Sequence, residues 1–323
     1  MKIVIPGGSG QVGAILARHF RARGHDVVII SRKPGEPGTP WRTIVWDAVS
    51  LGPWASELDG ADVVINLAGR SVNCRYNEKN RRDIMASRID STRVVGNAIA
   101  KAQRPPRVWL QSSGATIYAH RFDAPNDEAT GIIGGDPREQ GAPASWNFSI
   151  EVVKAWEQEL ADAKTPATRK VILRMAMVMS PDKGGIFDTL ATLVRRGLGG
   201  NVGGGGGRQY VSWVHEADFL RAVEFLIERE SLDGPVNIAS PNPLPYSDFM
   251  RALRNAMGVK IGLPATRLML ELGAIFMRTE TELVLKSRRV VPGRLLDAGF
   301  DFTFPDWPAA AKELVSRWKY RRT

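Results

Sequence analysis

The sequence contains little of what cross-links a protein or binds a metal ion. Cys74 is the single cysteine among 323 residues, and there are four histidines. One cysteine excludes an intramolecular disulfide framework and fits a reducing compartment. The histidines, His19, His25, His120 and His215, are not spaced as ligands of one ion, so we expect no metal site.

Long apolar runs are missing too. No stretch approaches the length of a membrane span, and residues 1–5 lead directly into a glycine turn instead of a signal-peptide core. We therefore expect a cytoplasmic protein that has no membrane partner. The net charge of +10 is spread along the chain, and its densest run, 318–323, is a chain terminus. Because no nucleic-acid motif accompanies this charge, we expect no nucleic-acid partner.

Glycine, by contrast, is plentiful, with 32 residues, and its most informative cluster is Gly-Gly-Ser-Gly-Gln-Val-Gly at 7–13. This cluster follows an apolar run at 3–5 and precedes an amphipathic helical pattern at 12–23. A diphosphate can reach main-chain N–H groups and a helix N-terminus only where no Cβ intrudes. The strand–turn–helix context therefore predicts a dinucleotide cradle. Its residues are Gly7, Gly10, Gln11, Val12 and Gly13.

Strand-like and helical patterns alternate along the first part of the chain. The strand-like runs are 3–5, 26–30, 43–46, 62–67, 107–111 and 170–174, and the helical patterns between several of them are 12–23, 78–102 and 147–163. Such alternation predicts an α/β fold with a doubly wound parallel sheet.

The end of the second strand bears on the identity of the nucleotide. It reads Ser31-Arg32-Lys33, where an NAD-specific fold usually carries an acidic residue for the ribose 2′-hydroxyl. A hydroxyl and a guanidinium can bind a 2′-phosphate, so NADP(H) is favoured over NAD(H). The alternative is a solvated basic turn. Asp47, after the third strand, is the expected partner of the adenine amino group. Main chain can pass close to the cofactor after the fourth strand, at Leu67, Ala68 and Gly69.

Several motifs agree in order and spacing with one known superfamily. They are Gly7–Gly13, Asn66–Gly69, Ser87–Arg88, Leu173–Arg174, Gly207–Tyr210, Trp213–His215 and Ala298–Phe300. Together they resemble an atypical branch of the extended short-chain dehydrogenase/reductases, the proteins labelled "epimerase family", which carry a distinctive C-terminal helical domain. The resemblance covers nearly the whole chain.

This resemblance implies a Rossmann domain that binds NADP(H) and a smaller domain that forms the other wall of a substrate cleft. We assign 1–180 to the NADP-binding domain. Residues 181–323 are mainly the substrate-side C-terminal domain, with a return segment near 208–240 that completes the sheet. The resemblance also places the helix with Asp83 and Arg88 against the cofactor. An ordinary charged surface helix is the alternative for that pair.

Ordinary members of the superfamily carry a Tyr and, four residues later, a Lys on one helical face. The ammonium lowers the pKa of the phenol so that it can exchange a proton with substrate. In this sequence the two positions align with Phe148 and Val152, so the pair is missing.

The segment after the fifth strand also departs from the family pattern, because the usual active-site hydroxyl aligns with Gly114. Neighbouring hydroxyls are the candidates to replace it. Ser112 is a candidate for binding the nicotinamide, and Ser113, Thr116 and Tyr118 are candidate catalytic residues. Strand-end capping is the alternative role for the serines, and packing with a polar tip is the alternative for Tyr118.

The sequence supports two functions. The first is an NADP(H)-binding oxidoreductase or epimerase that acts on a small carbonyl or sugar-nucleotide-type substrate, with orientation in the cleft lowering the barrier. The second is a non-catalytic regulatory or redox-sensing protein that binds NADP(H), which the loss of both proton-handling positions motivates. We expect a small-molecule substrate or ligand and either a monomer or a homodimer.

Overall fold

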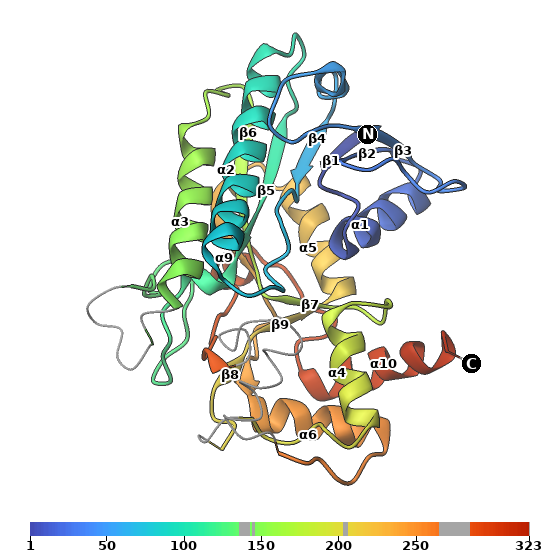
Figure 1. The fold of residues 1–323 in the computed structure, drawn as a ribbon, viewed down its shortest axis with the longest axis vertical. Coiled ribbons are helices and arrows are strands. Elements are labelled where there is room, and N and C mark those ends of the chain that lie inside the picture. The colour runs from blue at the N-terminus through green and yellow to red at the C-terminus, as the bar shows by residue number, and fades with distance from the viewer. Residues whose placement is uncertain (136–142, 144–145, 203–205, 265–284, 323) are drawn as a thin grey trace.

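A computed structural model of the chain describes residues 1–135, 143, 146–202, 206–264 and 285–322. Its larger lobe contains a seven-stranded sheet in the order β10-β6-β5-β4-β1-β2-β3, and every neighbouring pair is parallel (Figure 1). The strands are β1 (Lys2–Pro6), β2 (Asp26–Ser31), β3 (Arg42–Val45), β4 (Val63–Asn66), β5 (Val108–Gly114), β6 (Arg169–Met175) and β10 (Gly234–Ile238). The predicted doubly wound α/β fold is confirmed.

Helices cover both faces of this sheet. One face carries α1 (Gln11–Ala22) and α5 (Glu216–Glu228), and the other carries α2 (Glu78–Lys101) and α3 (Asn147–Asp162). Parallel strands buried on both faces read as continuous apolar runs. In β1, Ile3 and Ile5 pack with α1 and α5, and Val4 packs on the opposite face. The single-turn helices η1 (Pro53–Glu57) and η2 (Ala115–Ile117) follow β3 and β5.

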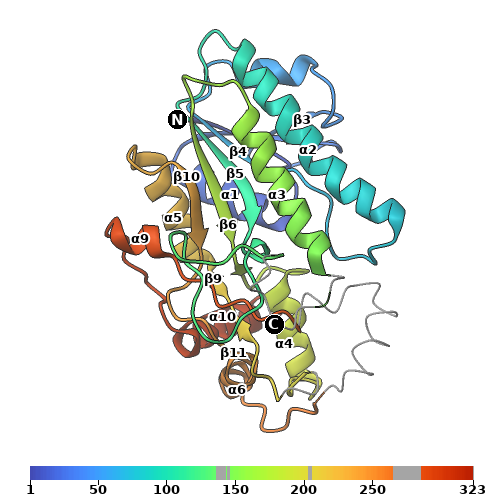
Figure 2. The same cartoon turned by 90° about the vertical axis from the view of Figure 1, so that its left-hand side faces the viewer.

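The smaller lobe is mainly helical (Figure 2). It contains α4 (Ile186–Arg195), α6 (Tyr246–Met257) and α10 (Trp307–Tyr320), with the strand pairs β7 (Met177–Met179) with β9 (Trp213–His215) and β8 (Tyr210–Val211) with β11 (Leu244–Pro245). Its core is aromatic: Trp213 and Trp307 are fully buried, and Phe249 stacks on Trp307 with ring centroids 4.1 Å apart. The short helix α9 (Gly293–Asp297) lies beside β10.

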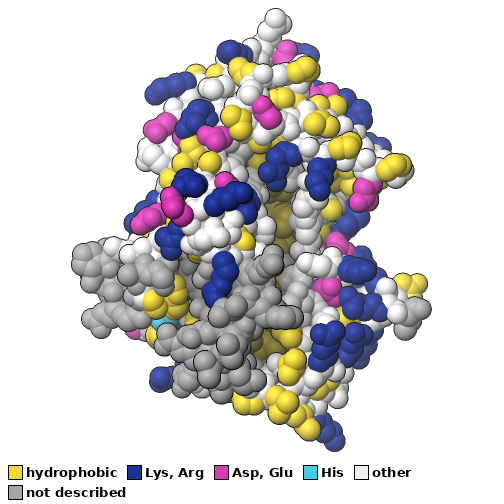
Figure 3. All heavy atoms as spheres, in the orientation of Figure 1, with side chains coloured by type: hydrophobic (Ala, Val, Ile, Leu, Met, Phe, Trp, Pro, Cys, Tyr) yellow, Lys and Arg dark blue, Asp and Glu magenta, His cyan; other side chains and the backbone are white. Residues whose placement is uncertain are grey.

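The chain passes between the lobes more than once. Within 208–240, β8 and β9 pair in the small sheets, and β10 then pairs with β6 in the large one. The surface is hollowed between the two lobes on the face drawn in Figure 3. No helix among the described residues combines the length and the apolar character needed to cross a membrane.

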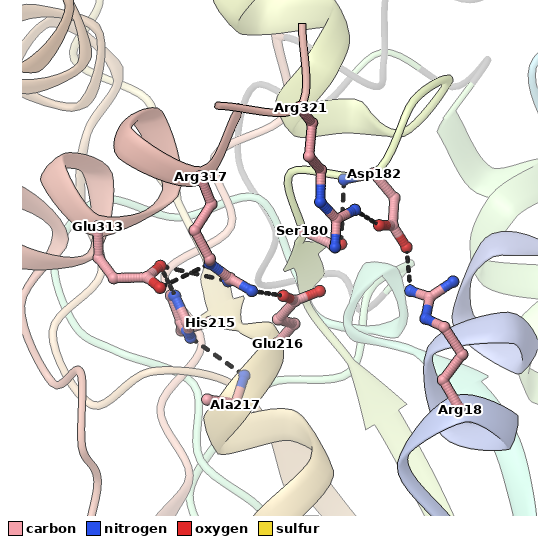
Figure 4. Close-up of polar contacts among 9 residues, drawn as sticks. All are labelled: Arg18, Ser180, Asp182, His215, Glu216, Ala217, Glu313, Arg317 and Arg321. Carbon is pink, nitrogen blue, oxygen red and sulfur yellow. Dashed lines mark hydrogen bonds and ion pairs between the residues drawn. The ribbon is translucent and has the colours of Figure 1, made fainter. Parts of the chain in front are cut away.

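Charged side chains tie α10 to the rest of the molecule (Figure 4). Asp182, in the loop between β7 and α4, accepts hydrogen bonds from Arg18 of α1 and from Arg321 just after α10. Arg317 of α10 pairs with Glu216, the first residue of α5, at 2.6 Å. The C-terminal helix is thereby joined to two helices that cover the sheet.

His215 of this network is almost fully buried, at 1% exposure. Its Nδ1 accepts the backbone N–H of Ala217 at 3.1 Å and so caps α5. The neutral ring therefore carries its proton on Nε2, which lies 2.9 Å from the Glu313 carboxylate. Burial lowers the pKa of His215, and the hydrogen bond with Glu313 opposes this only in part.

This lowered pKa predicts a pH-dependent contribution to stability. The stabilisation from neutral His215 is present above its unfolded pKa of 6.5 and is lost as the pH falls through the lower folded pKa. We expect the wild type to lose unfolding free energy between about pH 7.5 and about pH 5.5. His215→Asn, which keeps an N-cap acceptor, should lose less. Urea unfolding at both pH values measures the difference, and equal losses would contradict this role.

Candidate functional site

The turn between β1 and α1 is shaped by close main-chain approaches. Gly7 has a φ of +74°, and a Cβ there would lie 2.5 Å from the Cα and N atoms of Ala68. A Cβ on Gly13 would overlap the backbone of Gly8. The packing of the chain itself therefore requires both glycines, because neither position has room for a side chain. The positive φ of Gly7 disfavours an L side chain in addition.

Gly10 differs, because a Cβ there would meet no atom within 4 Å. It is the N-cap of α1, and no side chain caps that end. The first intrahelical bond runs from the Ala14 N–H to the Gly10 oxygen at 2.9 Å, so the N–H groups before Ala14 have no helical partner. The positive end of α1 is thus left available to an anion.

Gln11 adds a second unsatisfied group at the same place. Its Nε2 atom is buried and has no hydrogen-bond partner within the described part of the chain. The side chain lies directly against Gly185, where a Cβ would collide with the amide. A buried amide normally has a partner. The orphaned donor and the open space over Gly10 therefore fit a bound diphosphate.

The loop after β4 forms the next wall. Leu67 donates its N–H to the Pro6 oxygen at 2.8 Å, and Ala68 donates its N–H to the Asn66 side chain at 3.1 Å. Asn66 is itself held, because its Nδ2 donates to Gln111 at 3.0 Å. The loop is therefore fixed against the glycine turn by main-chain contacts.

The corner after β2 carries the basic residues. Ser31 is buried, and its Oγ accepts the Lys33 N–H at 3.2 Å. Arg32 and Lys33 are exposed, and neither forms an ion pair within the described ranges. The corner therefore presents two uncompensated cations beside the buried hydroxyl.

Asp47, after β3, is exposed, and local hydrogen bonds hold its side chain. Its carboxylate accepts hydrogen bonds from the Ser50 hydroxyl at 2.6 Å and from the backbone N–H groups of Ser50 and Val49, both at 2.8 Å. These bonds lower the pKa of Asp47 to about 2. A carboxylate has about four acceptor positions, so one remains for a further donor.

Asp83 and Arg88 of α2 support the loop after β4. Asp83 pairs with Arg70. The Arg88 guanidinium donates to the Arg70 oxygen at 3.1 Å and to the Ile84 oxygen at 3.0 Å, and it lies 4.9 Å from the ring centre of Trp156. Burial lowers the pKa of Arg88 to about 10, so it remains charged at neutral pH. Both residues brace the loop that approaches Gly7.

β5 extends to Gly114, past the expected end at 111, so Ser112 and Ser113 lie in the strand, whereas Thr116 and Tyr118 follow it. Ser112, Ser113 and Tyr118 are buried. Ser113 donates to Glu157 at 2.6 Å, and Tyr118 donates to the Asn237 side chain and accepts from Arg174, both at 3.0 Å. Burial raises the pKa of Tyr118.

Thr116 is the half-buried exception in this segment. No hydrogen bond of its side-chain hydroxyl is found within the described residues. Its hydroxyl is therefore available to a ligand.

A buried row of charged and polar side chains, which the sequence did not indicate, forms hydrogen bonds with Ser113 and Tyr118. We call it the buried ionic row. Ser113, Arg174 and Asn237 are register neighbours on β5, β6 and β10. Glu157 of α3 pairs with Arg174 through two bonds of 2.9 and 2.7 Å. Burial alone would lower the pKa of Arg174, but Glu157 outweighs it and the pKa is raised. Glu128 extends the row by accepting the Asn237 N–H at 2.7 Å.

Phe148 and Val152 lie where the Tyr–Lys pair is expected. They are 7% and 4% exposed and pack with Ile84 of α2. The Phe148 ring lies edge-on to Tyr76 with centroids 5.1 Å apart, and the Arg81 guanidinium lies 4.8 Å from its centre. An apolar cluster occupies this position, and it holds no proton donor from either residue.

The fold and this turn define the class of protein, a Rossmann fold of the extended short-chain dehydrogenase/reductase type. The chain belongs to the NAD dependent epimerase/dehydratase family, because the model of that family matches residues 3–239. A domain of unknown function, DUF1731, matches residues 265–314. The family resemblance seen in the motifs is confirmed.

Relatives match the chain over its full length. It is 31% identical to the human epimerase family protein SDR39U1 over 98% of this chain and 100% of the relative. It is 30% identical to the epimerase family protein YfhF of Bacillus subtilis, over 98% of both chains. A crystal structure of human SDR39U1 (isoform 2) with NADPH has a TM-score of 0.81 and 29% identity, covering 98% of this chain and 99% of that one. The likeness thus includes both lobes.

Two alanine substitutions distinguish the glycines of the turn. Gly7→Ala forces a Cβ against Ala68 at a left-handed φ, so we expect a loss of about 3 kcal/mol of unfolding free energy. Gly10→Ala meets no atom, so we expect a loss of about 1 kcal/mol or less, from the poorer N-cap. Urea denaturation compares the two. Equal destabilisation would show that Gly10 also serves internal packing.

Proposed function

We propose that this protein binds NADP(H) at the carboxyl edge of the sheet and prefers it to NAD(H). The observation that carries the proposal is the open space over Gly10 at the uncapped N-terminus of α1. The amide of Gln11 and the cations Arg32 and Lys33, which have no side-chain partner among the described residues, support it. The human relative of known structure was crystallised with NADPH.

Each part of the nucleotide has residues suited to hold it. The N–H groups of Gln11 and Val12 would bind the diphosphate, and Ser31, Arg32 and Lys33 would bind the 2′-phosphate. The free acceptor position of Asp47 suits the adenine amino group. The close packing at Gly7 and Gly13 would hold the turn in place, and the loop at Leu67, Ala68 and Gly69 would lie against the ligand, with Asp83 and Arg88 bracing that loop from behind.

We further propose that the bound cofactor serves an oxidoreductase or epimerase reaction on a small carbonyl or sugar-nucleotide-type substrate. The nicotinamide supplies the hydride acceptor or donor when it is bound. Thr116 is the hydroxyl we assign to the substrate oxygen, because it has no internal partner within the described residues. Ser112 lies at the same end of β5, and Ser113 and Tyr118 are held beside it by hydrogen bonds to the buried ionic row.

A second function is favoured by the apolar cluster at Phe148 and Val152. General acid–base help is worth about 10² to 10⁴ in rate, and these side chains offer none. Ser113 and Tyr118 are also committed to internal hydrogen bonds. Under this alternative the protein binds NADP(H) and reports the redox state without turnover.

The basic corner predicts the preference between nucleotides. We expect wild type to bind NADPH at least tenfold more tightly than NADH. Arg32→Glu should weaken NADPH binding by about 10- to 100-fold and leave NADH within about threefold, because an acidic residue repels the 2′-phosphate. Lys312→Glu on the exposed side of α10 is the control of equal charge change. Titration followed by nicotinamide fluorescence gives the dissociation constants. NADH binding as tight as NADPH binding in wild type would refute the preference.

Turnover separates the two functions. NADPH-loaded protein is incubated with a library of carbonyl compounds, and NADP+-loaded protein with a library of sugar nucleotides, while nicotinamide absorbance and products are followed. We expect turnover on at least one substrate class, reduced about 10²-fold in Thr116→Val. Thr192→Val in α4 is the matched control. Intact cofactor binding with no turnover across the library would favour the regulatory function.

A further inference from the structure

The loop between β7 and α4, residues 180–185, lies against the helix whose N-terminus we assign to the diphosphate. We name it the junction loop. Gly185 lies directly against the side-chain amide of Gln11, the first residue of α1. Asp182 accepts a hydrogen bond from Arg18 of the same helix (Figure 4). Gln11 and Arg18 are about two turns apart, so they lie on one face of α1. The junction loop therefore contacts α1 both at its first turn and further along that face.

Hydrogen bonds within the chain connect the parts of the junction loop. The backbone N–H of Asp182 donates to the Ser180 hydroxyl at 3.3 Å, and that of Gly185 donates to the Asp182 oxygen at 3.4 Å. The N–H of Gly184 donates to the carboxylate of Asp188, in the first turn of α4, at 2.8 Å. A shift of the backbone at Gly185 would therefore move both Asp182 and Asp188.

The same two carboxylates hold the end of α10. Arg321 donates to Asp182, Arg322 donates to Asp188, and the Trp318 Nε1 donates to Asp188 at 2.7 Å. The side chains of Asp182 and Asp188 are 14% and 12% exposed, but those of Arg321 and Arg322 are 47% and 30% exposed. Ion pairs this open to water contribute little free energy, and terminal helical turns fray. The end of α10 is therefore held weakly enough for ligand binding to shift it.

We propose that the junction loop couples the cofactor site to the last turn of α10, so that NADP(H) binding and the docking of that turn favour each other. Gln11 is the point of contact. Its amide, which has no partner among the described residues, gains one when the diphosphate binds, and its side chain then holds Gly185 in place. Coupling between two sites is reciprocal, so the docked turn also tightens NADP(H) binding. This inference rests on the proposed binding of NADP(H).

Hydrogen exchange of backbone amides measures the docking directly. We expect saturating NADPH to slow exchange within 314–322 about fivefold or more in wild type. The double variant Arg321→Gln with Arg322→Gln removes both ion pairs and leaves Arg18 on Asp182. In this variant NADPH should no longer slow exchange there. Because the coupling is reciprocal, the variant should also bind NADPH about fivefold or more weakly.

The double variant Lys312→Gln with Lys319→Gln is the matched control. It removes the same charge from the same helix, and both lysines are exposed. A basic surface attracts any anion, so the control measures that general effect, and we expect it to change NADPH affinity by less than about twofold. Exchange within 314–322 should still slow on addition of NADPH.

The outcomes are distinct. If wild type binds NADPH and exchange within 314–322 does not change, or if the lysine variant weakens binding as much as the arginine variant, the inference is overturned and NADP(H) binding stands. If wild type binds no NADPH, the proposed function is overturned, and the inference falls with it. If the arginine variant does not fold, the exchange of wild type with and without NADPH still decides.

Discussion

The site depends on the close approach of two main-chain segments, the turn after β1 and the loop after β4. Gly7 leaves no room for a Cβ beside Ala68, and Leu67 bonds to Pro6. Loss of this contact would move the loop away from α1, and the uncapped helix end would no longer have the loop beside it. Asn66 maintains the approach from within the sheet, and Asp83 and Arg88 maintain it from α2 through their contacts with Arg70 of the loop.

The second determinant is the buried ionic row at the carboxyl ends of β5, β6 and β10. Ion pairs removed from water add little net stability, but losing one partner is costly, so such pairs fix geometry. Glu157 and Arg174 fix Ser113 and Tyr118 in this way. With those hydroxyls engaged and Phe148 apolar, the chemistry we assign to the site depends on Thr116.

Local patterns in the sequence predicted the fold class and six of the seven strands of the large sheet, whereas β10 was not among the strand-like runs. The apolar runs became the parallel strands, and the glycine turn lies between β1 and α1 as expected. Contacts between distant segments could not be predicted, because periodicity does not report which strands become neighbours. The bonds of Tyr118 with Arg174 and Asn237 are of this kind, and so is that of Lys286 with Thr116. A local contact was missed as well, because the sequence around Asp47 did not indicate the turn in which its carboxylate accepts a hydrogen bond from Ser50.

The central claim is that the space over Gly10 receives the diphosphate of NADP(H) and that the corner after β2 receives its 2′-phosphate. A crystal structure of the chain with NADPH tests this most directly. The account predicts diphosphate density against the N–H groups of Gln11 and Val12, with the 2′-phosphate beside Ser31 and Arg32. Nucleotide density at another place, or an empty glycine turn at saturating NADPH, would contradict it.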